Sequence, residues 1–255
     1  MILTVTDSEG RVVRRLTGPV SAGLHRVVWN LRYPSAAPIR STTAAPSGFG
    51  GFGVGSGPYV VPGTYTVSLA KSVDGVVTPV GQPQSFEVYP LDGEAPPRSP
   101  AVLAFQQQTA ALQRAMLGAS AAAGDAATRI GLLKRALRET TGDVSQLDAD
   151  VQVLEDNLQA LRWELSGDPT MRRRNEPSPP SLQQRLGGIT GGAWSSSLQD
   201  VTGTQRRQYE ILAGEFGGIL DRLRQLIEVD LKAIEDAAEA AGAPWTSGRL
   251  PNWKP

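Results

Sequence analysis

The stretch that decides the fold is Gly23-Leu-His-Arg-Val-Val-Trp-Asn-Leu-Arg-Tyr-Pro34. A turn glycine opens it, alternating apolar residues follow, and a proline ends it, which is the pattern of a β-strand. Because side chains of a strand point alternately to its two faces, we expect His25, Val27 and Trp29 on one face. The sequence therefore predicts a central strand over residues 24–31, with other strands as its neighbours.

Four further segments alternate between apolar and polar residues and predict short strands. They are residues 2–6, 11–16, 64–70 and 84–88. Turn residues stand between them, because Gly10 can take a positive φ and Asp74-Gly75 is a strong hairpin signal. Antiparallel strands at this spacing predict an immunoglobulin-like β-sandwich over residues 1–92.

The core and the loop of this sandwich can be predicted residue by residue. The expected core is Trp29, Tyr65, Val67 and Leu69. Residues 35–58 are rich in Gly, Ser, Ala and Pro, which predicts a mobile loop. Three aromatic residues in or beside this loop are the expected contacts for a ligand or a partner: Phe49, Phe52 and Tyr59.

The second half of the chain predicts long helices. From Val102 to Leu137 apolar or small residues recur every three or four positions, which predicts one helix of about 40 residues with Ser99 as its N-cap. A leucine-rich seam with coiled-coil spacing follows over residues 147–165. Thr202-x-x-Gln205 is a capping-box pattern that opens a final long helix.

The final helix has a predicted buried face and completes a bundle. That face is Tyr209, Leu212, Phe216, Leu220, Leu223, Ile227, Leu231, Ile234, Ala238 and Ala241. With a short extra helix near 181–188, the three long helices predict an antiparallel bundle over residues 99–243. Residues 244–255 form an apolar tail. Either this tail folds back on the bundle, or its Trp245 and Trp253 contact a partner. The fold class is α+β, with more than one domain.

Composition excludes several kinds of site. The chain has no cysteine and a single histidine, His25, so thiolate metal sites, disulfides, a cysteine nucleophile and a histidine metal cluster are excluded. The formal net charge is zero, which gives no broad attraction to nucleic acid. No apolar run is long enough to span a membrane. We predict no catalytic residue, no cofactor and no metal ligand.

Some patterns suggest chemistry but are better explained without it. Gly48-Phe-Gly-Gly-Phe-Gly53 matches G-x-G-x-x-G, but a strand rather than a helix follows it, so a nucleotide site is not expected. A catalytic triad with His25 would need a nucleophile motif such as G-x-S-x-G, which the sequence does not contain. We therefore expect His25 to be a partly buried packing residue. Arg172-Arg173-Arg174 lies in a proline-rich stretch and is expected to be solvated.

Two groups of carboxylates could suggest a glycosidase, which requires two carboxyl groups in one cleft. They are Asp148, Asp150, Glu155, Asp156 and Glu164 on one predicted helix and Glu228, Asp230, Glu235, Asp236 and Glu239 on another. Both groups avoid the predicted seam positions. We therefore expect both to be solvated helix faces.

Three motifs of the first half carry a resemblance to a known family. They are Asp7-x-x-Gly10-x-Val12-Val13-Arg14-x-Leu16, Gly23-x-x-x-Val27-x-Trp29-x-x-Arg32 and Pro62-Gly63-x-Tyr65-x-Val67-x-Leu69. They resemble the Ig-like domain of the flagellar hook-capping type. More closely, the chain resembles the C-terminal region of large bacterial BNR/Asp-box propeller proteins, of the sortilin-like or glycosyl-hydrolase-like kind. The family usually has a further strand before the one at Ile2, so we expect this chain to be a fragment.

The resemblance implies two functional hypotheses. The first is a non-catalytic C-terminal structural or interaction module of a propeller protein, whose partner is the β-propeller of the same parent protein. Trp245 and Trp253 would contact this missing propeller if the tail does not fold back on the bundle. The alternative is a carbohydrate-binding accessory module of an exported glycoside hydrolase, whose catalytic propeller lies outside this chain. The partner would then be a protein or a glycan, with no nucleic acid and no membrane span. Export to the periplasm or the extracellular space is implied by the resemblance alone.

Overall fold

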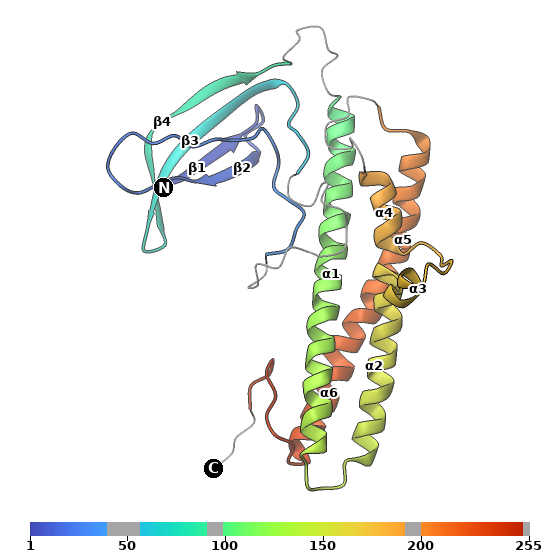
Figure 1. Cartoon of the computed structure of the whole chain (residues 1–255). Helices are drawn as coiled ribbons and strands as arrows, with labels where there is room; N and C mark the ends of the chain where they lie inside the picture. The colour runs from blue at the N-terminus through green and yellow to red at the C-terminus, as the bar shows by residue number, and fades with distance from the viewer. Residues whose placement is uncertain (40–56, 91–98, 192–199, 252–255) are drawn as a thin grey trace. The chain divides into compact units, whose positions relative to one another are not determined.

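The computed structural model describes residues 1–39, 57–90, 99–191 and 200–251 (Figure 1). Strands come first and helices follow, which confirms the α+β class. The chain divides into two compact units. We call Met1–Ala111 with Thr190–Gly203 the sheet unit, and Leu112–Ile189 with Thr204–Pro255 the helical unit.

The described residues of the sheet unit form one antiparallel sheet with the strand order β2-β1-β3-β4. The strands are β1 (Ile2–Thr6), β2 (Val12–Thr17), β3 (Gly63–Val73) and β4 (Val76–Val88). Both predicted hairpins are confirmed. Asp74 and Gly75 have φ values of 50° and 81°, as a two-residue turn of type I′ requires.

The first hairpin is closed by the side chain of Asp7. One of its carboxylate oxygens accepts hydrogen bonds from the backbone N–H groups of Glu9 at 3.0 Å and Arg11 at 2.9 Å. Burial by itself would raise the pKa of Asp7, but the hydrogen bonds from Arg11 and Glu9 outweigh it and lower the pKa. The turn chemistry read from Asp7 to Gly10 therefore works through this carboxylate.

One face of the sheet is apolar and carries the core of the unit. The register places Leu3 beside Leu69, Val5 beside Val67, and Tyr65 beside Phe86. The buried centre consists of Val5, Val13, Val60 and Tyr65. Trp29 and Val67 are half-buried and pack against it, so three of the four predicted core residues lie in or beside the core. The fourth, Leu69, is half-buried.

The predicted central strand over residues 24–31 is wrong. The segment forms no strand, and only an isolated bridge joins Arg32 to Tyr59. Local contacts replace strand pairing: the indole N–H of Trp29 donates to the carbonyl of Arg32 at 3.1 Å, and Leu31 has a φ of 57°. A left-handed residue reverses the chain and interrupts an extended ladder. The segment still packs Trp29 against the core, but as irregular structure.

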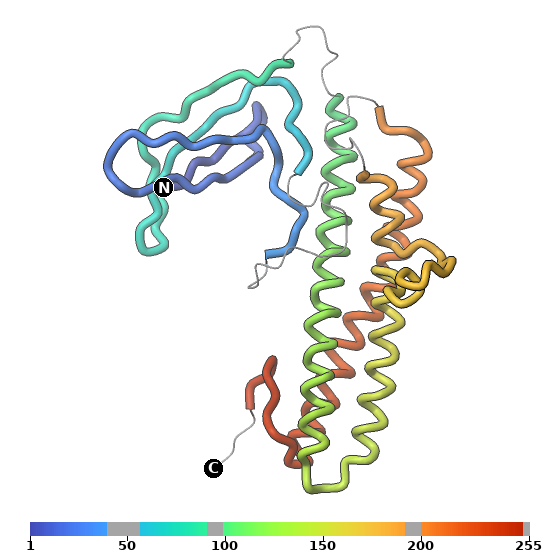
Figure 2. Tube along the Cα trace, viewed as in Figure 1, coloured from blue at the N-terminus to red at the C-terminus, as the bar shows by residue number. Residues whose placement is uncertain are grey.

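The helical elements follow the predicted order. They are α1 (Pro100–Arg138), α2 (Ser145–Ser166), α3 (Pro169–Arg173), α4 (Leu182–Thr190), α5 (Gly203–Arg224), the π-helical segment η1 (Gln225–Asp230) and α6 (Leu231–Ala240). Figures 1 and 2 show α2 antiparallel to α1, with α5 and α6 continuing one another beside them. The long first helix is confirmed at 39 residues, and the hydroxyl of Ser99 accepts from the backbone N–H of Ala101 at 3.2 Å.

Packing of the helices follows the predicted seams in part. In α2 the seam is buried as predicted, at Val151, Leu154, Leu158, Leu161 and Leu165. The short helix near 181–188 is confirmed as α4, and it begins with a capping box. The backbone N–H of Ser181 donates to Oε1 of Gln184 at 2.8 Å. In return, the backbone N–H of Gln184 donates to the Ser181 hydroxyl at 3.3 Å. The sequence signal for this capping box is Ser181-x-x-Gln184.

The final helix differs from the prediction at its centre. It is not α-helical throughout, because η1 interrupts it with a wider turn. Ile219 and Leu226 are buried where Leu220 and Ile227 were predicted, and Glu235 is buried where Ile234 was predicted. The predicted face is therefore wrong at these three positions, and a carboxylate takes one of the core places.

Candidate functional site

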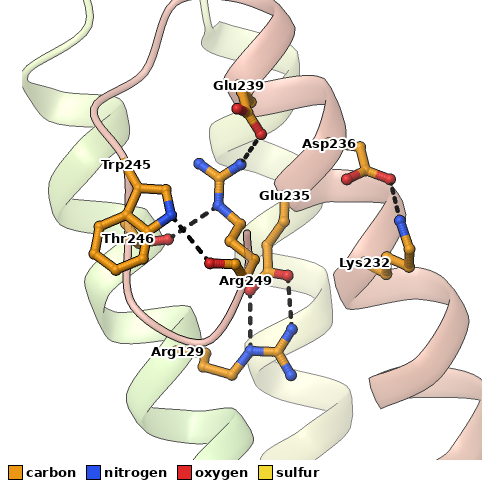
Figure 3. A network of polar contacts seen from close by, with 8 residues as sticks. All are labelled: Arg129, Lys232, Glu235, Asp236, Glu239, Trp245, Thr246 and Arg249. Carbon is orange, nitrogen blue, oxygen red and sulfur yellow. Dashed lines mark hydrogen bonds and ion pairs between the residues drawn. The ribbon is translucent and has the colours of Figure 1, made fainter. Parts of the chain in front are cut away.

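A network of ion pairs and hydrogen bonds in the helical unit joins α1 to α6 (Figure 3). Nε of Arg129 donates to one carboxylate oxygen of Glu235 at 3.0 Å, and Nη2 donates to the other at 2.6 Å. The Glu235 side chain is 3% exposed and that of Arg129 25%. This is a bidentate, largely buried ion pair, an arrangement that suits the planar guanidinium group.

A second ion pair fastens residues 242–251, which we call the C-terminal segment. Nη1 of Arg249 donates to the carboxylate of Glu239, and the Arg249 side chain is only 9% exposed. The indole N–H of Trp245 donates to the carbonyl of Arg249 at 3.1 Å, and Thr246 is buried. Figure 3 shows these residues around the end of α6. The pair thus holds the segment against α6.

Gly248 brings the C-terminal segment against Arg129 as well. Its φ is 103°, and a Cβ at this position would lie 3.2 Å from Cδ of Arg129. A side chain there would strain the backbone and crowd the arginine. The two ion pairs therefore form one connected site, in which two cations and two anions balance.

The predicted solvated face of the last helix is wrong at Glu235, which is buried, and at Glu239, whose side chain is only 19% exposed beside Arg249. Glu228 and Asp236 are exposed as expected, and Asp236 pairs at the surface with Lys232 at 2.5 Å. Glu235 is buried because the wider turn of η1 rotates the following helix. A signal for this irregularity is present in the sequence. In a regular α-helix the buried position after Leu226 would be Asp230, and a charged residue at a core position indicates that the helix is not regular there.

The carboxylates of α2 lie outside its buried seam, as predicted. Glu155 pairs with Lys134 of α1 at 2.6 Å, and Glu164 pairs with Arg222 of α5 at 2.5 Å. The hydrogen bond to Glu164 raises the pKa of Arg222. These carboxylates connect helices to one another instead of converging on a cleft.

A small polar pocket of about 210 Å³ lies where α2 ends and α3 begins. Its lining includes Ser166, Asp168, Arg172, Asn175, Glu176 and Gln184. Asp168 caps α3, since one of its oxygens accepts from the backbone N–H and the hydroxyl of Thr170, both at 2.7 Å. These hydrogen bonds lower the pKa of Asp168. Its carboxylate therefore has a structural role already.

Of the five residues predicted to contact a ligand or a partner, the structure describes two, Tyr59 and Trp245. Phe49, Phe52 and Trp253 lie outside the described residues. Tyr59 is half-buried, and the guanidinium carbon of Arg32 lies 3.5 Å from its ring centroid, so one ring face is covered. Trp245 is 55% exposed, as a partner contact requires.

His25 is exposed, so the prediction that it is partly buried is wrong. Its Nε2 lies 2.8 Å from the carbonyl oxygen of Ser21, in the same irregular segment.

Across the described residues, no group of three or more His, Cys, Asp or Glu side chains is placed to hold a metal ion. The three arginines 172–174 are exposed, and Arg174 pairs with Glu176 at 3.1 Å.

The sheet unit exposes an apolar feature that the sequence analysis did not single out. Pairing of β1 with β3 ends at Ala70, whereas the β3–β4 hairpin continues to Val73 and Val76. We call residues 71–79 the β3–β4 arm; Figure 1 shows the hairpin tip beyond β1. Val73 is 58% exposed, Val76 66% and Val77 58%. The arm thus presents uncovered valines on two strands.

Comparison with known protein families, with curated proteins and with solved structures gives no match for this chain. In the part of the chain that the structure describes, no helix combines the length and the apolar character needed to cross a membrane.

Proposed function

We propose that the chain is a non-catalytic structural and interaction module, in which an immunoglobulin-like half and a helical bundle form a scaffold. The proposal is supported by ion pairs that join one helix to another. Lys134, Arg222 and Arg129 each bind a carboxylate on another helix. Such pairs fix helices relative to one another, which is the task of a scaffold.

The observation that carries the interaction role is the apolar β3–β4 arm. The register places Val73 beside Val76 and Leu69 beside Val80. Since side chains two positions apart share a sheet face, both pairs lie on the face that begins at Tyr65, with the polar pair Lys71–Thr78 between them. The exposed fraction rises to 58% at Val73 and 66% at Val76. An exposed valine pair at the tip of this face favours a protein contact over solvent.

The β4 edge of the described sheet is less suited to binding than this face. β4 is an edge strand, and it contains Pro79 and Pro83. Proline has no backbone N–H, so it cannot donate to an added strand, and prolines on edge strands discourage such pairing. We therefore expect a partner to cover the valines of the arm instead of adding a strand beside β4.

The partner that we propose is the β-propeller of the same parent protein, and the family resemblance supports it. The first experiment is to read the DNA upstream of the Met1 codon. A reading frame that continues into Asp-box repeats is the expected result. A stop codon followed by a ribosome-binding site would contradict a parent propeller protein.

The interaction itself is tested with the propeller encoded upstream, titrated with this chain. We expect the double variant V73T/V76T to weaken binding at least tenfold, because it removes apolar contact while keeping β-branched side chains. V20T is the matched control, since Val20 is 85% exposed but lies outside the arm. Equal binding by both variants would show that the arm is not the contact surface.

The non-catalytic part of the proposal has its own test. The purified chain is assayed against aryl glycosides, because a glycoside hydrolase is the alternative enzyme class. We expect no turnover. Turnover that disappears in E155Q or E164Q would overturn the proposal, since a carboxylate of α2 would then act on substrate.

A further inference from the structure

The buried positions of the final helix reveal one extra residue. From α5 through α6 they are Leu212, Phe216, Ile219, Leu223, Leu226, Leu231, Glu235 and Ala238. Neighbouring positions are three or four residues apart, as an α-helix requires, except between Leu226 and Leu231, which are five apart. The backbone shows the cause, because the N–H of Leu231 donates to the carbonyl of Leu226, five residues earlier. η1 therefore accommodates a one-residue insertion.

A regular α-helix would bury a different set of residues. With α5 unchanged, Asp230 would take the place of Leu231, and Ile234 the place of Glu235. Each arrangement therefore puts one carboxylate into the core. Leu231 is 0% exposed in the structure, so Asp230 at that place would be a buried charge.

The position of Arg129 distinguishes the two arrangements. In the observed one, the guanidinium binds Glu235 with two hydrogen bonds, and Asp230 accepts a hydrogen bond from the side chain of Gln225 at 2.9 Å. In the regular one, Asp230 would lie one helical turn from the place where Arg129 binds a carboxylate, with a shorter side chain. A buried charge without its partner is strongly unfavourable.

We infer that the Arg129–Glu235 pair is a register lock, which holds the extra residue in η1 and so fixes the rotation of α6. This inference concerns the helical unit and does not depend on the proposed interaction role. A buried ion pair that specifies register at the expense of apolar packing is the best-attested use of such pairs.

The lock also controls the C-terminal segment. Conversion of η1 into regular helix would rotate α6 by about 100° and move it by about 1.5 Å along its axis. Glu239 would turn away from Arg249, and Arg129 would lose its contact with Glu235 beside Gly248. The segment therefore stays docked only in the locked register.

Two single-residue deletions test whether η1 holds an insertion. Deletion of Val229, which is 52% exposed within η1, should leave a regular helix with every buried residue in place. Deletion of Gly218, an exposed residue of α5, should displace the core residues before it. We expect the Tm to stay within about 3 °C of the parent in the first variant and to fall by about 10 °C or more, or folding to be lost, in the second. An equal loss in both variants would overturn the inference.

Two substitutions test whether the ion pair is the lock. In D230L the pair is intact, and NMR correlations through the hydrogen bond should still connect the amide of Leu231 to the carbonyl of Leu226. In R129L/D230L the lock is absent and the regular helix buries apolar residues only, so the acceptor should become the carbonyl of Ile227. Retention of the Leu226 acceptor in the double variant, or its loss in D230L, would show that the pair does not set the register.

Discussion

The sheet unit and the helical unit differ in how much of their structure a local pattern specifies. An α-helix satisfies its backbone hydrogen bonds within one segment, so the apolar spacing of residues 102–137 was enough to predict α1. A strand needs a partner strand, and alternation does not say whether one is present. Residues 24–31 have the alternation but form no strand, which makes their pattern informative about packing rather than pairing.

The largest expected effect comes from breaking the buried pair of the helical unit. E235A should destabilise the unit by about 3–5 kcal/mol, because it leaves the guanidinium of Arg129 without its partner in a largely buried site. Urea unfolding followed by circular dichroism at 222 nm measures this loss.

The matched control lies one residue further along α6. Asp236 forms an ion pair of the same kind with Lys232, but both side chains are at least half-exposed, at 50% and 64%. D236A should therefore change stability by only about 0.5 kcal/mol. If E235A were as mild as D236A, burial would not distinguish the two carboxylates.

The comparison also shows what the sequence can and cannot predict of the candidate site. Apolar spacing predicted α1 and α2, and Ser99 was predicted as the cap of α1, because each signal lies within or beside its own segment. The partnership of Arg129 with Glu235 joins residues more than 100 positions apart, and it depends on the extra residue in η1. Periodicity averaged over the whole helix conceals such an insertion, which is why Glu235 was assigned to the solvated face.

A smaller effect is expected in the sheet unit, at Trp29. Its ring centroid lies 5.8 Å from that of Tyr65 and 6.1 Å from that of Phe86, in edge-to-face contacts. W29A should cost about 2–4 kcal/mol, toward the lower end of the range for a buried tryptophan, because the side chain is only half-buried. The measurement is the urea midpoint of unfolding, followed by the NMR amide signals of the sheet residues.

V28A provides the control for this position, since Val28 is 76% exposed in the same irregular segment. It should change stability by less than about 0.5 kcal/mol. A tryptophan substitution without effect would mean that the segment covers the core without stabilising it, and the strand pattern would then have no energetic meaning.

Tyr65 gives a third, still smaller effect, and the size of this effect depends on pH. The hydroxyl donates to the carbonyl of Val61 at 2.7 Å, so Y65F should cost about 1 kcal/mol near neutral pH. Burial raises the pKa of Tyr65 from 10.0 to about 12. The folded state therefore holds the phenol proton more tightly than the unfolded state does.

The direction of the pH dependence follows from this difference. The contribution of the Tyr65 proton is fully present below pH 10 and is lost as the pH rises through about 12. The parent chain should lose stability over this window, and Y65F should lose less. Absorbance at 295 nm reports the titration. A pKa near 10 for this tyrosine, or the same alkaline loss in Y65F, would contradict burial as the cause.

The smallest effect is expected from the exposed pair between Arg222 of α5 and Glu164 of α2. Its geometry is as good as that of the buried pair, with a nitrogen–oxygen distance of 2.5 Å, but the side chains are 55% and 44% exposed. A double-mutant cycle with R222A and E164A should therefore give a coupling of about 0.2–1 kcal/mol, which decreases in 1 M NaCl. The Arg129–Glu235 cycle should exceed it and change little with salt, since buried pairs are screened less. Equal couplings and equal salt dependence would mean that burial adds nothing to the inner pair, and a register lock built on that pair would lose its energetic basis.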